Sequence, residues 1–135
     1  MTTVRHINPE GMHSNPAFTQ MISIDGPHRT LYIGGQNAVS AKGEIVGKGD
    51  IRTQAKQVFQ NLQTALSAGG ASLENIVKWN IYAVQGQPMQ PAIEVFQEAW
   101  GRRPNPPTIS VIIVAGLANP DFLLEIDAVA VVPIQ

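Results

Sequence analysis

Two kinds of hydrophobic periodicity alternate along the 135-residue chain. From Asp50 to Gly70, apolar side chains recur at helical spacings, which predicts an amphipathic helix capped by Asp50 and ended by the glycine pair at 69–70. A second helical stripe runs from Met89 to Trp100, with prolines near its start and Gly101 at its end. Elsewhere the pattern changes to the two-residue alternation that is typical of strands.

The alternating segments predict strands over residues 4–8, 18–24, 30–36, 77–84, 108–114 and 122–132, with a possible shorter one at 44–46. The turn residues at 25–27 predict that the second and third of these form a hairpin. This order of elements indicates one α+β domain over residues 1–135. Two helices of this length cover only one face of such a sheet. We therefore expect other copies of the chain to cover the second face.

The last segment, Phe122 to Val132, carries Glu125 and Asp127 on one face because side chains alternate across a strand. A charge among apolar neighbours must be paired, protonated or directed into a solvated cleft. One interpretation is pairing, either with a cation elsewhere in the chain such as Lys78, Arg5 or Arg29, or with backbone groups at an interface. The other is general acid–base chemistry, because apolar surroundings and a nearby like charge raise the pKa of a carboxyl group.

Composition excludes several classes of function. Charged residues make up 14% of the chain and the net charge is −1, which argues against nucleic acid or an anionic membrane as a partner. The chain has no cysteine, so disulfides, thiolate ligands and a cysteine nucleophile are excluded. The first residues have no apolar signal core and no run approaches a membrane span, which favours a cytoplasmic location.

Three local patterns resemble ligand sites but lack the required chemistry. The segment 43–49 has too few residues between its glycines for a phosphate loop, so we interpret it as a turn. His6, His13 and His28 lie far apart and lack the spacing of a zinc helix, so no metal site is expected. Gly34 and Gly35 precede no helix; they either ease a bulge or let a ligand approach the backbone.

Several motifs together carry a family resemblance. They are the strand end LYIGGQ at 31–36, QAKQV at 54–58 followed by Asn61-Leu62, AGGASL at 68–73, Val77-Lys78, and the closing PTIS at 107–110 and LEIDAVA at 124–130. With these motifs the chain resembles, nearly end to end, the Rid/YjgF family. This family is also called the reactive intermediate deaminases or the L-PSP endoribonuclease family.

The resemblance implies a chorismate-mutase-like α+β fold, with a mixed sheet and two helices on one face. It implies homotrimers with ligand clefts between neighbouring subunits. The implied activity is hydrolysis of reactive enamines or imines to keto acids and ammonia, without a cofactor or metal in the protein. By position, Glu125 matches the family's water-positioning Glu, and Gly35 matches a backbone donor of the cleft, with Gly34 in place of the usual Ser.

Departures from the family pattern concentrate in this cleft. Ile109 stands where the family has a substrate-clamping Arg, in a Pro-x-Arg-Ser motif. Phe18 replaces a Tyr, Ile93 aligns near an Asn, and Val111 falls where a small Cys often lies. An isoleucine cannot replace a bidentate Arg–carboxylate contact. We therefore expect a more apolar cleft in which Glu125 is the polar group.

These departures favour a small-molecule hydrolase that acts on a less acidic imine or enamine. The first alternative is a non-catalytic trimer that binds a metabolite in a regulatory role. The second is a ribonuclease or translation inhibitor, which a near-neutral chain disfavours. The sequence leaves open the substrate, and whether Arg102 or Arg103 replaces the missing clamp.

Overall fold

The computed structural model describes residues 1–134 of the chain. Its elements, in chain order, are β1 (Thr3–Ile7), β2 (Met21–Asp25), β3 (His28–Gln36), α1 (Ile51–Ala68), the 3₁₀ helix η1 (Leu73–Asn75), β4 (Ile76–Val84), α2 (Gln90–Trp100), β5 (Thr108–Val114) and β6 (Leu124–Pro133). Both predicted helices are confirmed. The Asp50 side chain caps α1 as expected, because it accepts hydrogen bonds from the backbone N–H groups of Arg52 and Thr53.

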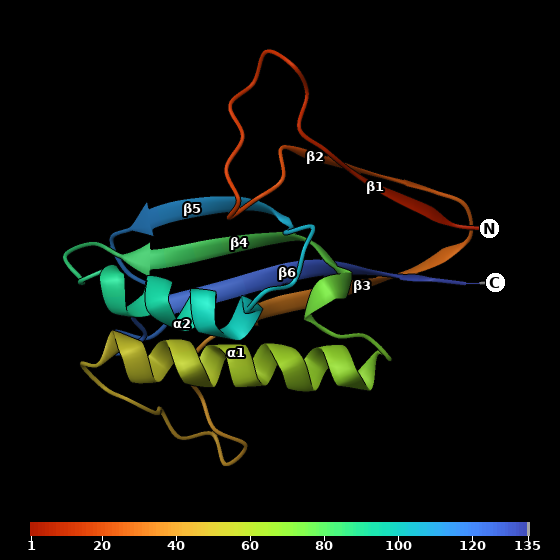
Figure 1. The fold of residues 1–135 in the computed structure, drawn as a ribbon. Helices are drawn as coiled ribbons and strands as arrows, with labels where there is room; N and C mark the ends of the chain where they lie inside the picture. Colours follow the sequence, from red (N-terminus) through yellow and green to blue (C-terminus); the bar gives the residue numbers. More distant parts are fainter. Residues whose placement is uncertain (135) are drawn as a thin grey trace.

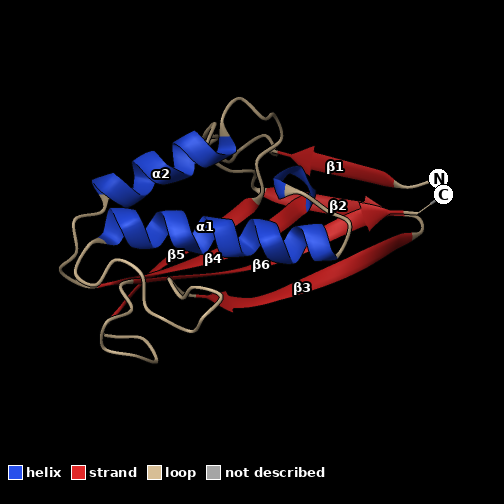
Figure 2. Cartoon of the chain, turned by 90° about the horizontal axis from the view of Figure 1, so that it is seen from below, coloured by secondary structure: helices blue, strands red, loops and turns tan. Residues whose placement is uncertain are grey.

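Four strands form one mixed sheet in the order β3-β6-β4-β5. Strand β6 pairs antiparallel with β3 and β4, and β4 pairs parallel with β5. Both helices lie below the sheet in Figure 1, and Figure 2 shows them crossing the same face. The expected α+β architecture, a mixed sheet with two helices on one face, is therefore confirmed.

The core lies between α1 and the central strand β6. The apolar stripe of α1 is buried there, against the alternate apolar residues of β6. These residues of β6 are Leu124, Ile126, Ala128 and Ala130, each at most 2% exposed. The alternation that the sequence predicts for this strand therefore holds, and it directs Glu125 and Asp127 to the face opposite the helices.

One polar side chain, Gln54, is fully buried in this core. Its Nε2 donates to the backbone carbonyls of Gly47, at 3.0 Å, and Asp121, at 2.8 Å. Its Oε1 accepts from the N–H of Leu123 at 2.9 Å. An amide can be buried at little cost when its polar atoms are all paired. Gln54 thereby joins the loop before α1 to the loop before β6.

Strands β1 and β2 form a separate two-stranded ribbon, so the predicted hairpin of 18–24 with 30–36 is wrong. The backbone N–H of Thr19 donates to Pro107 at 3.1 Å, and its hydroxyl donates to Pro106. These bonds hold the chain beside the start of β5, at the sheet edge opposite β3. A chain held there cannot run alongside β3. In Figure 1 the ribbon extends past the sheet toward the two termini.

The possible strand at 44–46 is also not formed. Ile45 makes only an isolated bridge with Val39. Gly43 and Gly47 flank the segment with φ of 80° and 78°, a left-handed conformation that turns the chain at both ends. The segment is therefore too short to extend a ladder.

The second face of the four-stranded sheet carries no helix from the described part of the chain (Figures 1 and 2). It presents apolar side chains to solvent, among them Tyr32, which is 83% exposed, and Ile112, which is 37% exposed. Such exposure fits the expectation that further copies of the chain cover this face. The homotrimer stays a prediction.

Candidate active site

Glu125 lies against the backbone of Gly35 on the helix-free face of the sheet. The register of β3 on β6 shifts between Ile33 and Gln36, so Gly34 and Gly35 form a bulge opposite Asp127, and the Glu125 side chain reaches Gly35 from two residues away. A Cβ atom built on Gly35 would lie 2.5 Å from the Glu125 Oε2, whereas one on Gly34 would meet nothing within 4 Å. Gly35 is therefore the residue whose lack of a side chain makes room for the carboxylate.

Asn37 holds this carboxylate. Its Nδ2 donates to Glu125 Oε1 at 3.2 Å and to the backbone carbonyl of Leu124 at 3.3 Å. Asn37 is itself fixed by helix α1, because Asn61 Nδ2 donates to its carbonyl oxygen at 3.1 Å. Gln57 Nε2 in turn donates to Asn61 Oδ1 at 2.8 Å. A chain of amides thus connects the helix layer to Glu125.

Asp127, on the same face, has a different environment. Asn80 Nδ2 donates to its Oδ1 at 2.9 Å, and the Tyr82 hydroxyl donates to its Oδ2 at 3.1 Å. The hydrogen bond to Asp127 is the main cause that raises the pKa of Tyr82; desolvation and the charges of Asp127 and Glu125 add to it. Both Asp127 oxygens are therefore used within the sheet, while Glu125 Oε2 has no hydrogen-bond partner among residues 1–134. This contrast fits a structural role for Asp127 and a chemical role for Glu125.

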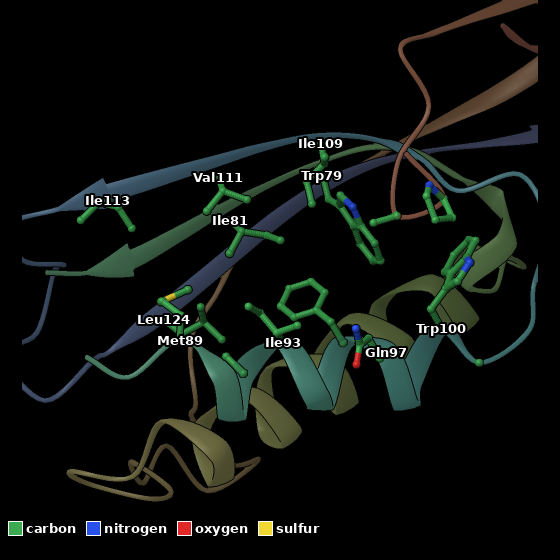
Figure 3. Close-up of a pocket in the computed structure, with 15 residues that line it drawn as sticks. Trp79, Ile81, Met89, Ile93, Gln97, Trp100, Ile109, Val111, Ile113 and Leu124 are labelled. Atoms are coloured by element: carbon green, nitrogen blue, oxygen red, sulfur yellow. The ribbon is translucent and has the colours of Figure 1, made fainter. Parts of the chain in front are cut away.

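An apolar cavity of about 580 Å³ lies on the helix side, between α2 and strands β4 and β5. Figure 3 shows Ile93 and Gln97 rising from α2 toward Ile109, Val111 and Ile113 on the strand above. The lining side chains are Pro16, Ala17, Trp79, Ile81, Met89, Ala92, Ile93, Phe96, Gln97, Trp100, Ile109, Val111, Ile113 and Leu124. None of them is ionisable.

Aromatic rings form the inner end of this cavity. Trp79 packs edge-to-face against Phe96 at 5.7 Å and against Trp100 at 5.9 Å between ring centroids. Phe59 of α1 packs behind them, 4.5 Å from Phe96 and 6.0 Å from Trp79. Such contacts fix the rings in place, so this end of the cavity has a defined shape.

The structure separates the residues that the sequence predicts for one cleft. Ile93, Ile109 and Val111 line the cavity on the helix side. Gly34, Gly35 and Glu125 lie on the other face. Phe18 is half-buried and packs edge-to-face against His13, with 5.8 Å between the ring centroids. It does not line the cavity, although Pro16 and Ala17 beside it do. Within one subunit, these residues therefore do not form one site.

The two arginines considered as replacements for the clamp lie beyond the end of α2. Arg103 donates to the Glu74 carboxylate at 3.0 Å and to the carbonyls of Ala99 and Trp100. Its guanidinium also lies over the Trp100 ring, at 6.0 Å from the centroid. Neither Arg102 nor Arg103 lines the cavity.

Sequence reasoning missed two residues of these sites. Asn37 directly follows the recognised LYIGGQ motif, and its side-chain amide could have been weighed as a partner for Glu125. Trp79 alternates with Lys78 and Asn80 along β4, and its register opposite Ile109 could not be known without the pairing of β4 and β5. Among residues 1–134, no three His, Asp or Glu side chains gather where they could hold a metal ion. No helix in the described residues has the length and apolar character to cross a membrane.

Comparison with known proteins places the chain in a family. A family model described as endoribonuclease L-PSP matches residues 12–132. This chain belongs to the Rid/YjgF family. A RutC family protein of Pyrococcus horikoshii is 37% identical over 101 residues, which cover 74% of this chain and 77% of that protein.

Two further members bear on fold and function. The crystal structure of YyfB from Yersinia pestis, a Rid family protein of unknown function, has a TM-score of 0.81 and 35% identity to this chain, covering 94% of this chain and 97% of that one. A 2-iminobutanoate/2-iminopropanoate deaminase of Dermatophagoides farinae is 28% identical over 133 residues, which cover 93% of this chain and 99% of the deaminase. The fold is thus that of the Rid family.

Proposed function

We propose that this Rid-family protein hydrolyses small, weakly acidic imines or enamines to carbonyl compounds and ammonia. The observation that carries the proposal is the Glu125 carboxylate, held by Asn37 over the glycine bulge with its Oε2 left for a ligand. The deaminase among the relatives supports the reaction class. The chemistry needs neither a cofactor nor a metal.

Glu125 would act on a water molecule and on protons. The carboxylate accepts a hydrogen bond from water and removes a proton as the water oxygen attacks the imine carbon. The imine reacts in its protonated form, so this attack turns the C=N bond into a C–N single bond and gives a neutral carbinolamine. Glu125 then gives its proton to the carbinolamine nitrogen. As the C–N bond breaks, Glu125 takes the hydroxyl proton, the carbonyl forms and ammonia leaves, and ammonia or solvent finally takes that proton from Glu125. An enamine enters the same path after protonation at carbon.

The separation of the two sets of residues suggests how a complete cleft would form. One subunit would supply Glu125 and the glycine bulge, and its neighbour would supply the cavity wall with Ile93, Ile109 and Val111. This arrangement agrees with the trimer that the family resemblance implies, and it covers both the exposed sheet face and the exposed side chains of β5. Val111 is 55% exposed and Ile113 56% exposed in the single chain.

The cavity wall supports an altered substrate. A substrate carboxylate would have no cationic partner there, because none of the lining side chains is ionisable. Burying an unpaired carboxylate is costly. Imines without a carboxylate, or with an apolar side chain that fills the cavity, therefore fit this wall better than small imino acids.

The test compares two enzymatic sources of imine. An amine oxidase acting on phenethylamine yields an imine without a carboxylate, and an amino-acid oxidase acting on alanine yields a small imino acid. Release of ammonia is measured with and without the protein. We expect acceleration with the first source, and a loss of about 100-fold or more in the Glu125→Gln variant, as for removal of a general acid–base group.

Asp127→Asn is the matched control, since it changes a carboxylate two residues away on the same face. It should retain most of the turnover. Light scattering should give three times the chain mass for the wild type and both variants. A trimeric Glu125→Gln protein with wild-type turnover would show that Glu125 takes no part in the mechanism. A monomeric wild-type protein would contradict a cleft shared between subunits.

A metabolite-binding trimer without turnover is the second candidate, favoured by the lack of ionisable groups in the cavity wall. Saturable binding of a small ligand with no product from either imine source would support it.

A further inference from the structure

Trp79 is the only cavity-lining residue in the described part of the chain whose side chain has a buried hydrogen-bond donor without a partner. Trp79 is 4% exposed, and its Nε1 is buried with no acceptor among residues 1–134. A buried indole N–H normally has a partner, because leaving it unsatisfied costs free energy. The Trp79 N–H is an exception to this pattern, and a bound ligand could supply the missing acceptor.

Trp100 provides the comparison within the same cavity. Its Nε1 donates to the backbone carbonyl of Arg103 at 2.8 Å, so its hydrogen-bonding capacity is used. Both indoles contact the cavity, and their rings pack against each other at 5.9 Å. The unmet donor is thus specific to Trp79 rather than general to the aromatic cluster.

The position of Trp79 places this donor beside the cavity wall formed by β5. Trp79 is the register partner of Ile109. Figure 3 shows the Trp79 ring extending from β4 into the space above α2, close to Ile109. The surrounding surface is apolar and aromatic, and apart from the two indoles the one polar side chain in the lining, Gln97, is exposed on α2.

We propose that the cavity binds an uncharged, aromatic or branched aliphatic ligand whose single hydrogen-bond acceptor, a carbonyl or imine-type atom, takes the Trp79 N–H. The inference deepens the proposed function and rests on it for the identity of this ligand as substrate or product. Apolar pockets with one or two placed polar groups are the usual form of small-molecule sites. Because neighbouring side chains cover Nε1 in the structure, the ligand engages it by displacing one of them.

Three probes of nearly equal shape test the proposal by binding alone. Acetophenone carries a neutral acceptor, isopropylbenzene has none, and benzoate is anionic. Calorimetric titration of the intact protein should show acetophenone binding at least roughly tenfold more tightly than benzoate, because the cavity offers an anion no cation. Benzoate binding as tightly as acetophenone would overturn the proposal.

The two tryptophans of the chain allow a direct readout of the donor. Their indole N–H resonances are assigned with Trp79→Phe and Trp100→Phe. Acetophenone should move the Trp79 proton downfield in a saturable manner, isopropylbenzene should not, and the bonded Trp100 proton should move less. An unchanged Trp79 resonance at saturation would contradict the inference.

Trp79→Phe keeps an aromatic ring and removes the donor. It should weaken acetophenone binding about tenfold, the worth of one hydrogen bond, and change isopropylbenzene binding by less than about twofold. Equal losses for both probes would mean that Trp79 acts through packing, which overturns the inference. Trp100→Phe should leave the ratio of the two affinities unchanged.

If Trp79→Phe does not fold, the ratio of acetophenone to benzoate affinity and the wild-type indole shift still decide. These binding measurements involve no turnover, so a negative result would not bear on the role of Glu125, which the imine assay tests. Likewise, a negative imine assay would not bear on the class of ligand that the cavity binds, which these probes test.

Discussion

Strand β6 presents Leu124 to one face of the sheet and Glu125 to the other, and the two side chains lie in opposite surroundings. Leu124 is fully buried in the helix-side layer and contacts the apolar cavity. Glu125 is half-buried among a bulge of glycines and the amide of Asn37. Adjacent residues of one strand thus contribute to the wall of an apolar cavity and to a carboxylate on the opposite face.

In the proposed function, shape recognition and chemistry come from opposite faces of a subunit. The cavity side contributes a rigid aromatic surface and one unmet donor. The carboxylate side contributes a held anion and the paired group of Asp127, Asn80 and Tyr82. Substitutions on one face should therefore change ligand preference, and those on the other should change turnover.

The strongest way to separate the two faces is Gly35→Ala. The new Cβ would lie 2.5 Å from Glu125 Oε2, so the flexible carboxylate must move away while the fold stays intact. We expect turnover to fall about 100-fold with little change in acetophenone affinity, because the general acid–base group is displaced. Gly34→Ala, which meets nothing within 4 Å, is the control and should be nearly silent. Wild-type turnover of Gly35→Ala would show that the position of Glu125 is not important.

On the cavity face, Ile109→Arg should change ligand preference instead. A guanidinium there can pair with a carboxylate, so benzoate affinity should rise by roughly tenfold and turnover of imino acids should increase. Ile109→Met controls for the longer side chain without its charge. If the two variants bind benzoate equally, the missing cation is not what disfavours anions.

Asn37→Ala tests whether the amide positions Glu125. Loss of one hydrogen bond to a charged group should lower kcat about tenfold and change KM little, because ligand contacts in the cavity remain. Asn37→Asp, which places a like charge at Glu125, should lower kcat further; a wild-type kcat in both variants would exclude this positioning role.

The smallest effect concerns Tyr82. Its hydrogen bond to Asp127 raises the pKa of the phenol, so the folded state keeps the proton more firmly than the unfolded state does. The stabilisation is complete below the pKa of an unfolded tyrosine, about 10, and is lost as pH rises through the higher folded value. The urea midpoint of the wild type should therefore decline above about pH 10 more than that of Tyr82→Phe. Parallel declines would contradict the coupling.

The sequence predicted both helices, the caps of α1, the central strands and the alternation that places Glu125 and Asp127 on one face of β6. These features depend on local patterns, which a sequence displays directly. It did not predict the separate β1–β2 ribbon, because the hydrogen bonds of Thr19 to Pro106 and Pro107 join residues almost ninety positions apart. The placement of Ile109 and Glu125 on opposite faces depends on strand pairing, which the motifs alone do not reveal.

The buried amide of Gln54 has a consequence for the motions of the molecule. It hydrogen-bonds to residues 47, 121 and 123, so the loops that lead into α1 and into β6 are held by the same side chain. Opening either loop breaks the same set of bonds, and the two should open together as one cooperative unit. Hydrogen exchange at the Leu123 amide should therefore report the rarest openings of this end of the protein. Gln54→Ala should make that amide exchange as fast as its loop neighbours.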